Sequence, residues 1–145
     1  MAFGIFSHGQ IGEALMWIYS TKGFYSIVEN RDNPNQVIIR ARLKKDIDNL
    51  KRIFDSLKLR TTKITVSSRT DYRYRFITDR MDWMTVMIRL MLSIDYDNFK
   101  NAVFKSESGK IRERRHEAYL KIWGIMCNLQ EFDRCEKDSA PMQSR

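Results

Sequence analysis

The chain has 145 residues, of which 43% are hydrophobic, 12% aromatic and 30% charged, as expected for one folded domain with a buried core. This composition excludes general disorder, and no apolar run reaches the roughly 18 residues of a membrane-spanning helix. The net charge of +8 is unevenly placed, because residues 36–80 contain thirteen Lys and Arg against five Asp and Glu. A charge excess confined to one segment produces a directed field that attracts polyanions.

Strand patterns dominate the first half of the chain. Aromatic and β-branched residues on either side of a Lys22-Gly23 break predict a hairpin, and a polar turn leads from it to a third strand. From Lys44 the apolar residues recur at helical spacing, which predicts a helix. In chain order, we expect strands over 15–20, 24–30 and 36–42, a helix over 44–58, strands over 63–68 and 71–78, and helices over 81–94, 97–105 and 110–132.

Strands therefore precede helices, and most connections are short. This order predicts an α+β fold, with an antiparallel β-sheet of four to five strands, helices packed on one face and a helical C-terminal half. We expect a single domain over 16–132, an N-terminal arm over 1–15 and a flexible tail over 133–145.

The strand over 71–78 alternates strictly. Alternation places Tyr72, Tyr74 and Phe76 on one face and Arg73 and Arg75 on the other. We expect the aromatic face to pack against the helices.

Side chains in the second half suggest helix ends and a buried stripe. Asp79 and Asp82 are expected to cap the helix over 81–94, whose nearly uniform apolarity predicts a central core helix. Asp97 is expected to cap the short helix that follows it. The last helix has an expected buried side of Ile111, Ala118, Tyr119, Ile122, Ile125, Met126, Leu129 and Phe132.

Basic residues are the main candidates for function. Four arginines on two strands would project from one sheet face, and the planar guanidinium suits phosphate because it donates two charge-assisted hydrogen bonds at once. The alternative is an ordinary solvated face, where arginine is common. The candidate binding residues are Arg40, Arg42, Lys63, Arg69, Arg73, Arg75, Arg112 and Arg115.

Two of these candidates, Arg112 and Arg115, belong to a second basic cluster in the first turns of the last helix. The helix dipole disfavours cations there, so the cluster is either an ion-paired solvated face or a site for an anion or acidic partner. Aromatic side chains offer another possibility, since single-strand binders stack bases on exposed rings. The glycine–aromatic pattern of that class is absent, however, and the rings alternate toward the expected helical side.

Catalytic and metal motifs are absent: there is no glycine-rich phosphate loop, HExxH or GxSxG. Cys127 and Cys135 lack CxxC spacing, and a zinc site needs about four ligands, so we interpret both as reduced cytoplasmic thiols and expect no metal and no cofactor. The first fifteen residues do not resemble a signal peptide. A metal-independent ribonuclease using Tyr74, Arg75 and His116 stays open as an alternative to a non-enzymatic protein.

Several segments resemble a family of small, uncharacterised bacterial and phage proteins. They are MWIYSTKGFYSIV from Met16, IRAR at 39–42, DYRYR at 71–75, IDYDNFKNAV at 94–103 and the pair Tyr119 and Trp123. The resemblance covers residues 16–130 and implies kinship without an assigned activity, cofactor or partner.

Three functions are compatible with the sequence. The first is a non-enzymatic module that binds nucleic acid, or a protein that handles nucleic acid, through the arginine-rich sheet face. The second is a phage or mobile-element inhibitor that docks on an acidic host defence protein. The third is a small ribonuclease toxin.

Overall fold

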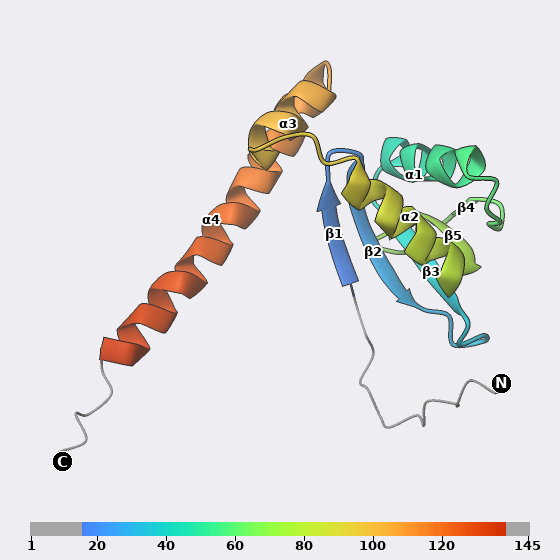
Figure 1. The fold of residues 1–145 in the computed structure, drawn as a ribbon, viewed down its shortest axis with the longest axis horizontal. Coiled ribbons are helices and arrows are strands. Elements are labelled where there is room, and N and C mark those ends of the chain that lie inside the picture. The colour runs from blue at the N-terminus through green and yellow to red at the C-terminus, as the bar shows by residue number, and fades with distance from the viewer. Residues whose placement is uncertain (1–15, 139–145) are drawn as a thin grey trace, which may run out of the picture. The chain divides into compact units, whose positions relative to one another are not determined.

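The structure, a computed structural model, describes residues 16–138, with side chains up to Phe132 (Figure 1). The chain divides into two compact units, one ending at Asp95 and the other beginning at Tyr96, and each is described by itself. The domain predicted over 16–132 spans both units. The predicted arm over 1–15 lies outside the described residues, as does the predicted tail beyond the end of the last helix.

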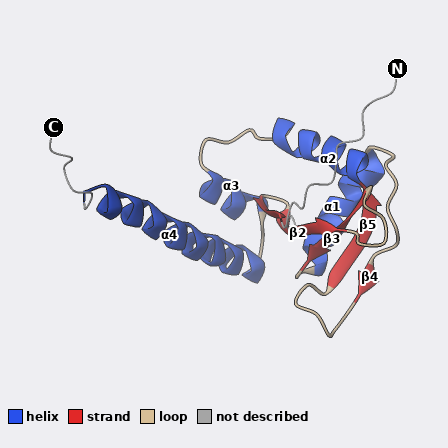
Figure 2. Ribbon diagram, turned by 90° about the horizontal axis from the view of Figure 1, so that it is seen from below, coloured by secondary structure: helices blue, strands red, loops and turns tan. Residues whose placement is uncertain are grey.

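The fold is α+β, with one five-stranded antiparallel sheet and a helical C-terminal half, as predicted. The sheet has the strand order β1-β2-β3-β5-β4, and Figure 2 shows the short β4 beside β5 at one edge. Among the described residues, no helix is long and apolar enough to cross a membrane. The elements are β1 (Met16–Ser20), β2 (Gly23–Glu29), β3 (Gln36–Ala41), α1 (Lys44–Ser56), β4 (Thr65–Val66), β5 (Tyr74–Asp79), α2 (Arg80–Leu92), α3 (Phe99–Ser106) and α4 (Lys110–Asp138).

The core of the first unit lies between one face of the sheet and the helices α1 and α2. The Phe54 ring of α1 lies edge-on to Phe76 of β5, with 5.3 Å between centroids, and stacks on Trp83 of α2 at 6.5 Å. Ile39 of β3 and Val86 of α2 are fully buried in the same cluster. Burial of each such side chain stabilises the fold by about 1.5–3 kcal/mol. This face of the sheet is therefore covered by the helices and forms the core.

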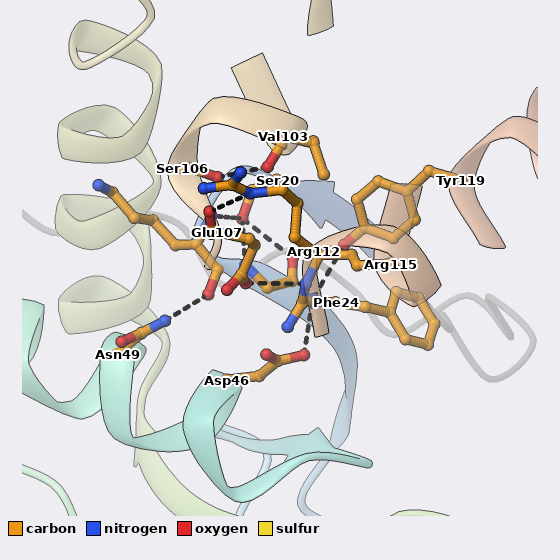
Figure 3. Close-up of polar contacts among 12 residues, drawn as sticks. Ser20, Phe24, Asp46, Asn49, Val103, Ser106, Glu107, Arg112, Arg115 and Tyr119 are labelled. Carbon is orange, nitrogen blue, oxygen red and sulfur yellow. Dashed lines mark hydrogen bonds and ion pairs between the residues drawn. The ribbon is translucent and has the colours of Figure 1, made fainter. Parts of the chain in front are cut away.

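Helix α1 is also tied to the turn between β1 and β2 by polar contacts (Figure 3). The buried Asp46 carboxylate accepts a hydrogen bond from the backbone N–H of Phe24 at 3.1 Å, and the Tyr25 hydroxyl donates to the Asp46 carbonyl at 3.0 Å. One turn later, the Asn49 side chain donates to the Lys22 carbonyl at 2.9 Å. These contacts fix the β1–β2 hairpin against α1.

The predicted cap of α2 is wrong. Asp79 occupies the N-cap position, but its side chain makes no cap hydrogen bond and accepts one from Gln36 at 3.2 Å. These two residues face each other in the β3–β5 ladder, so the cross-strand contact takes the carboxylate that capping would need. The Asp82 carboxylate accepts a hydrogen bond from the backbone N–H of Arg60 at 3.3 Å.

The prediction that α2 is a central core helix is also wrong. Within it only Trp83 and Val86 are buried. One face of the helix packs on β3 and β5, and the opposite face is exposed although it is apolar. The exposed large side chains of α2 are Met81, Met84, Ile88, Met91 and Leu92.

The second unit consists of α3 and α4. Asn98 caps α3, because its side chain accepts a hydrogen bond from the Asn101 N–H at 3.1 Å, and the predicted cap at Asp97 is therefore wrong. Helix α4 has 29 residues and continues to Asp138, into the segment for which the sequence predicts a flexible tail. Tyr119 is the only member of its predicted stripe that is buried.

Candidate nucleic-acid interface

One row of side chains crosses all five strands on the face opposite α1 and α2. The register aligns neighbouring strands residue by residue, and the row alternates with the buried Ile39 and Phe76. Among the described residues of this unit, both helices lie on the other face. In strand order, the row is Trp17, Ser26, Arg40, Arg75 and Thr65.

The two arginines of this row face each other directly across β3 and β5. Arg40 donates to the Ser26 hydroxyl at 2.7 Å, and Arg75 donates to the Tyr72 carbonyl at 3.0 Å and to the Thr70 hydroxyl. The Nε atoms of both arginines are buried and have no hydrogen-bond partner among the described residues. Like charges opposite each other and unpaired donors both destabilise a sheet, and such departures from local rules tend to mark functional sites.

Tyr72 lies on this arginine-bearing face, so the prediction that it packs with Tyr74 and Phe76 is wrong. Strand β5 begins only at Tyr74, and the alternation of the strand does not extend back to residue 72. Tyr72 is 8% exposed, and two guanidinium groups lie over its ring. The Cζ atom of Arg40 is 4.8 Å from the ring centroid, and the Cζ atom of Arg42 is 4.7 Å from it. Tyr74 and Phe76 pack in the core as predicted.

Further aromatic rings continue from Tyr72 toward the edge strand β1. The Phe24 ring lies 6.2 Å from Tyr72, stacks on Tyr19 at 4.6 Å and meets Trp17 edge-on at 5.9 Å. Trp17, at the edge, is 61% exposed. We call the set the arginine–aromatic face, and it comprises Trp17, Tyr19, Phe24, Arg40, Arg42, Tyr72 and Arg75.

The Tyr19 hydroxyl keeps its proton on this face. Burial raises the pKa of Tyr19 above its ordinary value, Tyr72 adds to the rise and the positive charge of Arg42 opposes it. At neutral pH the phenol is therefore a neutral hydrogen-bond donor, and it does not cancel the charge of the arginines.

The remaining sheet candidates lie outside the strands. Arg73 is exposed immediately before β5, and Lys63 and Arg69 are exposed in the segments on either side of β4. In the part of the chain that the structure describes, neither Arg42 nor Arg73 forms an ion pair with an acidic side chain. Their charges are thus available to an external anion.

Arg112 and Arg115, the candidates in α4, have internal partners (Figure 3). The buried Arg115 pairs with the buried carboxylate of Glu107 at 2.9 Å and donates to the Tyr119 hydroxyl at 3.4 Å. Arg112 donates to the Glu107 carbonyl at 2.7 Å and lies 5.0 Å over the Phe104 ring. Both side chains connect the start of α4 to the end of α3, and this contact offsets the unfavourable dipole there. We leave them out of the candidate interface.

The groups considered for ribonuclease chemistry are not assembled by the sheet. Tyr74 packs against the core, its neighbour Arg75 lies on the opposite face, and His116 belongs to the second unit, where its ring meets Phe104 at 5.4 Å. Among the described residues, no group of three or more His, Cys, Asp or Glu side chains could hold a metal ion.

Comparison of the chain with protein-family models, with curated proteins and with solved structures finds no match. The kinship with small bacterial and phage proteins that the sequence indicates stays a prediction. The function is therefore argued from the arginine–aromatic face itself.

Proposed function

We propose that the protein is a non-enzymatic module that binds single-stranded nucleic acid on the arginine–aromatic face. One observation carries the proposal: Arg40, Arg42 and Arg75 converge on Tyr72, beside an aromatic row that ends in the exposed Trp17. Phosphate groups and unpaired bases are the two chemical parts of a single strand, and the two halves of this face match them.

The arginine half suits a phosphate backbone. Arg40 and Arg75 lie directly opposite each other, and the exposed Arg42 shares the Tyr72 ring with Arg40. A phosphate placed over this group would relieve the mutual repulsion of the guanidiniums, and it would receive charge-assisted hydrogen bonds from them. Because such contacts release counterions, binding is expected to weaken steeply with salt.

The aromatic half favours a single strand over a duplex. Stacking on an aromatic side chain contributes about 1–3 kcal/mol per base, and it requires a base whose flat face is free. Trp17 is exposed at the edge of the sheet, where a base can reach it, whereas the bases of a duplex are already stacked on each other. An acidic protein surface, such as that of a host defence protein, could also pair with the arginines and pack on Trp17. Binding of an oligonucleotide is therefore the measurement that separates the two partners.

A charge-reversal pair tests this proposal. We expect Arg42→Glu to weaken binding of a labelled oligonucleotide of about 15 nucleotides by roughly tenfold or more, measured by fluorescence anisotropy. The loss of one phosphate contact also lowers the slope of log K against log salt by about 0.7. Arg52→Glu is the matched control, because this exposed residue belongs to α1 on the other side of the sheet and its reversal changes net charge equally.

We expect the control to stay within about twofold of the unaltered chain. Equal losses in the two variants would show attraction to net charge alone, and they would contradict a defined face. If the unaltered chain binds no oligonucleotide but retains a captured protein after nuclease treatment, the face serves protein docking instead.

A further inference from the structure

Helix α4 is far longer than the helix that covers it. At about 1.5 Å per residue, the eight residues of α3 span roughly 12 Å and the 29 residues of α4 roughly 43 Å. Phe99 stacks on Tyr119 at 5.6 Å, and the Lys100 ammonium lies 4.4 Å from the centroid of the Trp123 ring. Within the described part of this unit, Trp123 is the last residue of α4 with a ring contact to α3.

The apolar stripe of α4 nevertheless continues past that point. Ile125 is 65% exposed, Met126 58%, Leu129 59% and Phe132 63%. At about 100° per residue, Met126, Leu129, Ile125 and Phe132 lie within about 120° of the helix circumference, and Met126 lies next to Tyr119. Single exposed apolar side chains are normal on a protein surface, but a contiguous row of large ones marks an interaction site. We name the row Trp123, Ile125, Met126, Leu129 and Phe132 the α4 stripe.

We propose that the α4 stripe pairs with the same stripe of a second copy of this chain, with the two helices antiparallel. Large apolar side chains present on the order of 150–200 Å² each, and all five members are more than half exposed. Pairing would remove on the order of 500 Å² from water per chain, or about 1,000 Å² in total. That area lies at the lower limit of specific interfaces, so the dimer is of modest affinity.

The charges along α4 select the antiparallel arrangement. Residues 110–117 contain four Lys and Arg against two acidic residues, whereas residues 131–138 contain four acidic residues against two basic ones. An antiparallel pair centred on Met126 brings the acidic end of each helix toward the more basic half of the other. A parallel pair would bring like charges together at both ends.

Sedimentation of the full-length chain over about 1–200 µM tests the dimer. We expect a concentration-dependent mass that reaches twice that of one chain. Leu129→Glu should raise the dimer dissociation constant at least tenfold, because it places a charge within the stripe. Asn128→Glu is the matched control, since Asn128 is an exposed residue of the same helix that lies outside the stripe; it should leave association unchanged.

Disulfide cross-linking then tests the orientation, in a chain whose Cys127 and Cys135 are replaced by serine. Met126→Cys should form a disulfide with its own copy on oxidation. Leu129→Cys should not, because an antiparallel pair centred on Met126 separates the two Leu129 positions by about 9 Å along the helix axis, more than a disulfide spans. A monomer throughout the concentration range would overturn the proposal. It would also be overturned if Leu129→Glu dimerised normally with unaltered helix content, or if Asn128→Glu disrupted the dimer as strongly as Leu129→Glu. Efficient cross-linking through Leu129→Cys would exclude the antiparallel pair.

Discussion

Tyr72 is the residue that organises the arginine–aromatic face. Its ring lies beneath the guanidiniums of Arg40 and Arg42, and its carbonyl accepts a hydrogen bond from Arg75. Each cation–ring contact contributes about 0.5–2 kcal/mol, which partly offsets the repulsion between the arginines. The three side chains are thereby held in place before a ligand arrives, so little of their conformational entropy is lost on binding.

Gly23 is the residue that the β1–β2 hairpin cannot replace. Its φ of +154° is one that side chains rarely adopt. A Cβ atom there would lie 2.7 Å from the Asp46 Cβ and Cγ atoms and 2.8 Å from the Tyr25 hydroxyl. The close approach of this turn to α1 therefore depends on the absence of a side chain.

Gly23→Ala should lower the free energy of unfolding by about 2–4 kcal/mol, because it combines backbone strain with a clash against a buried contact. Gly109→Ala is the control: Gly109 has a φ of +64°, and nothing lies within 4 Å of its added Cβ. The control should cost about 1 kcal/mol. Denaturant unfolding of both variants measures the difference, and equal losses would show that the contact at Asp46 imposes no restraint.

At the scale of elements, α3 and α4 are joined by the buried ion pair between Glu107 and Arg115. The pair lies where the two helices meet, at the first turns of α4. Two buried charges stabilise little when intact, but removal of one leaves the other in a medium of low polarity. The junction between the helices therefore depends on both partners.

Glu107→Ala should cost about 3 kcal/mol, because it removes the acidic partner of a buried cation. Glu113→Ala is the comparison, since this exposed carboxylate lies in the first turn of the same helix, and its loss should cost less than about 0.5 kcal/mol. Thermal unfolding followed by circular dichroism reports both values. A loss at Glu107 as small as that at Glu113 would contradict a structural role for the pair.

Most elements could be predicted because their signals are local. The break at Lys22-Gly23, the strand before it and the change to helical spacing at Lys44 each lie within one short segment. The α+β class then follows from the order of the elements and the shortness of the connections.

Which face of a helix or strand is buried could not be predicted for several elements, because burial depends on contacts with residues far away in the sequence. The alternation over 71–78 continues unbroken in the sequence, yet β5 begins at Tyr74 and Tyr72 falls on the opposite face. The stripe of α4 is visible in the sequence, but the length of its partner α3 is not, so the exposure of Leu129 was not foreseen. The sequence offers Trp17 as one of several rings that could stack bases, but it gives no reason to choose it, and it does not indicate Phe24. Their neighbours on the face come from β3 and from the segment before β5.

At the scale of the whole molecule, the two units carry different surfaces. The sheet unit contains the charge excess of residues 36–80 and the arginine–aromatic face, whereas the helical unit contains the α4 stripe. If the stripe pairs two chains, each pair has two arginine–aromatic faces. Binding and pairing can be removed separately, since Arg42 and Leu129 belong to different units.

The central claim is that unpaired bases stack on the arginine–aromatic face, and the emission of Trp17 tests it most directly. The chain has three tryptophans, so the difference between the unaltered chain and Trp17→Phe isolates this one. Titration with a single-stranded oligonucleotide should quench that difference signal with the same midpoint as anisotropy, whereas a duplex of the same sequence should leave it unchanged. Tight binding of the single strand with no change in Trp17 emission, or equal quenching by the duplex, would contradict the account.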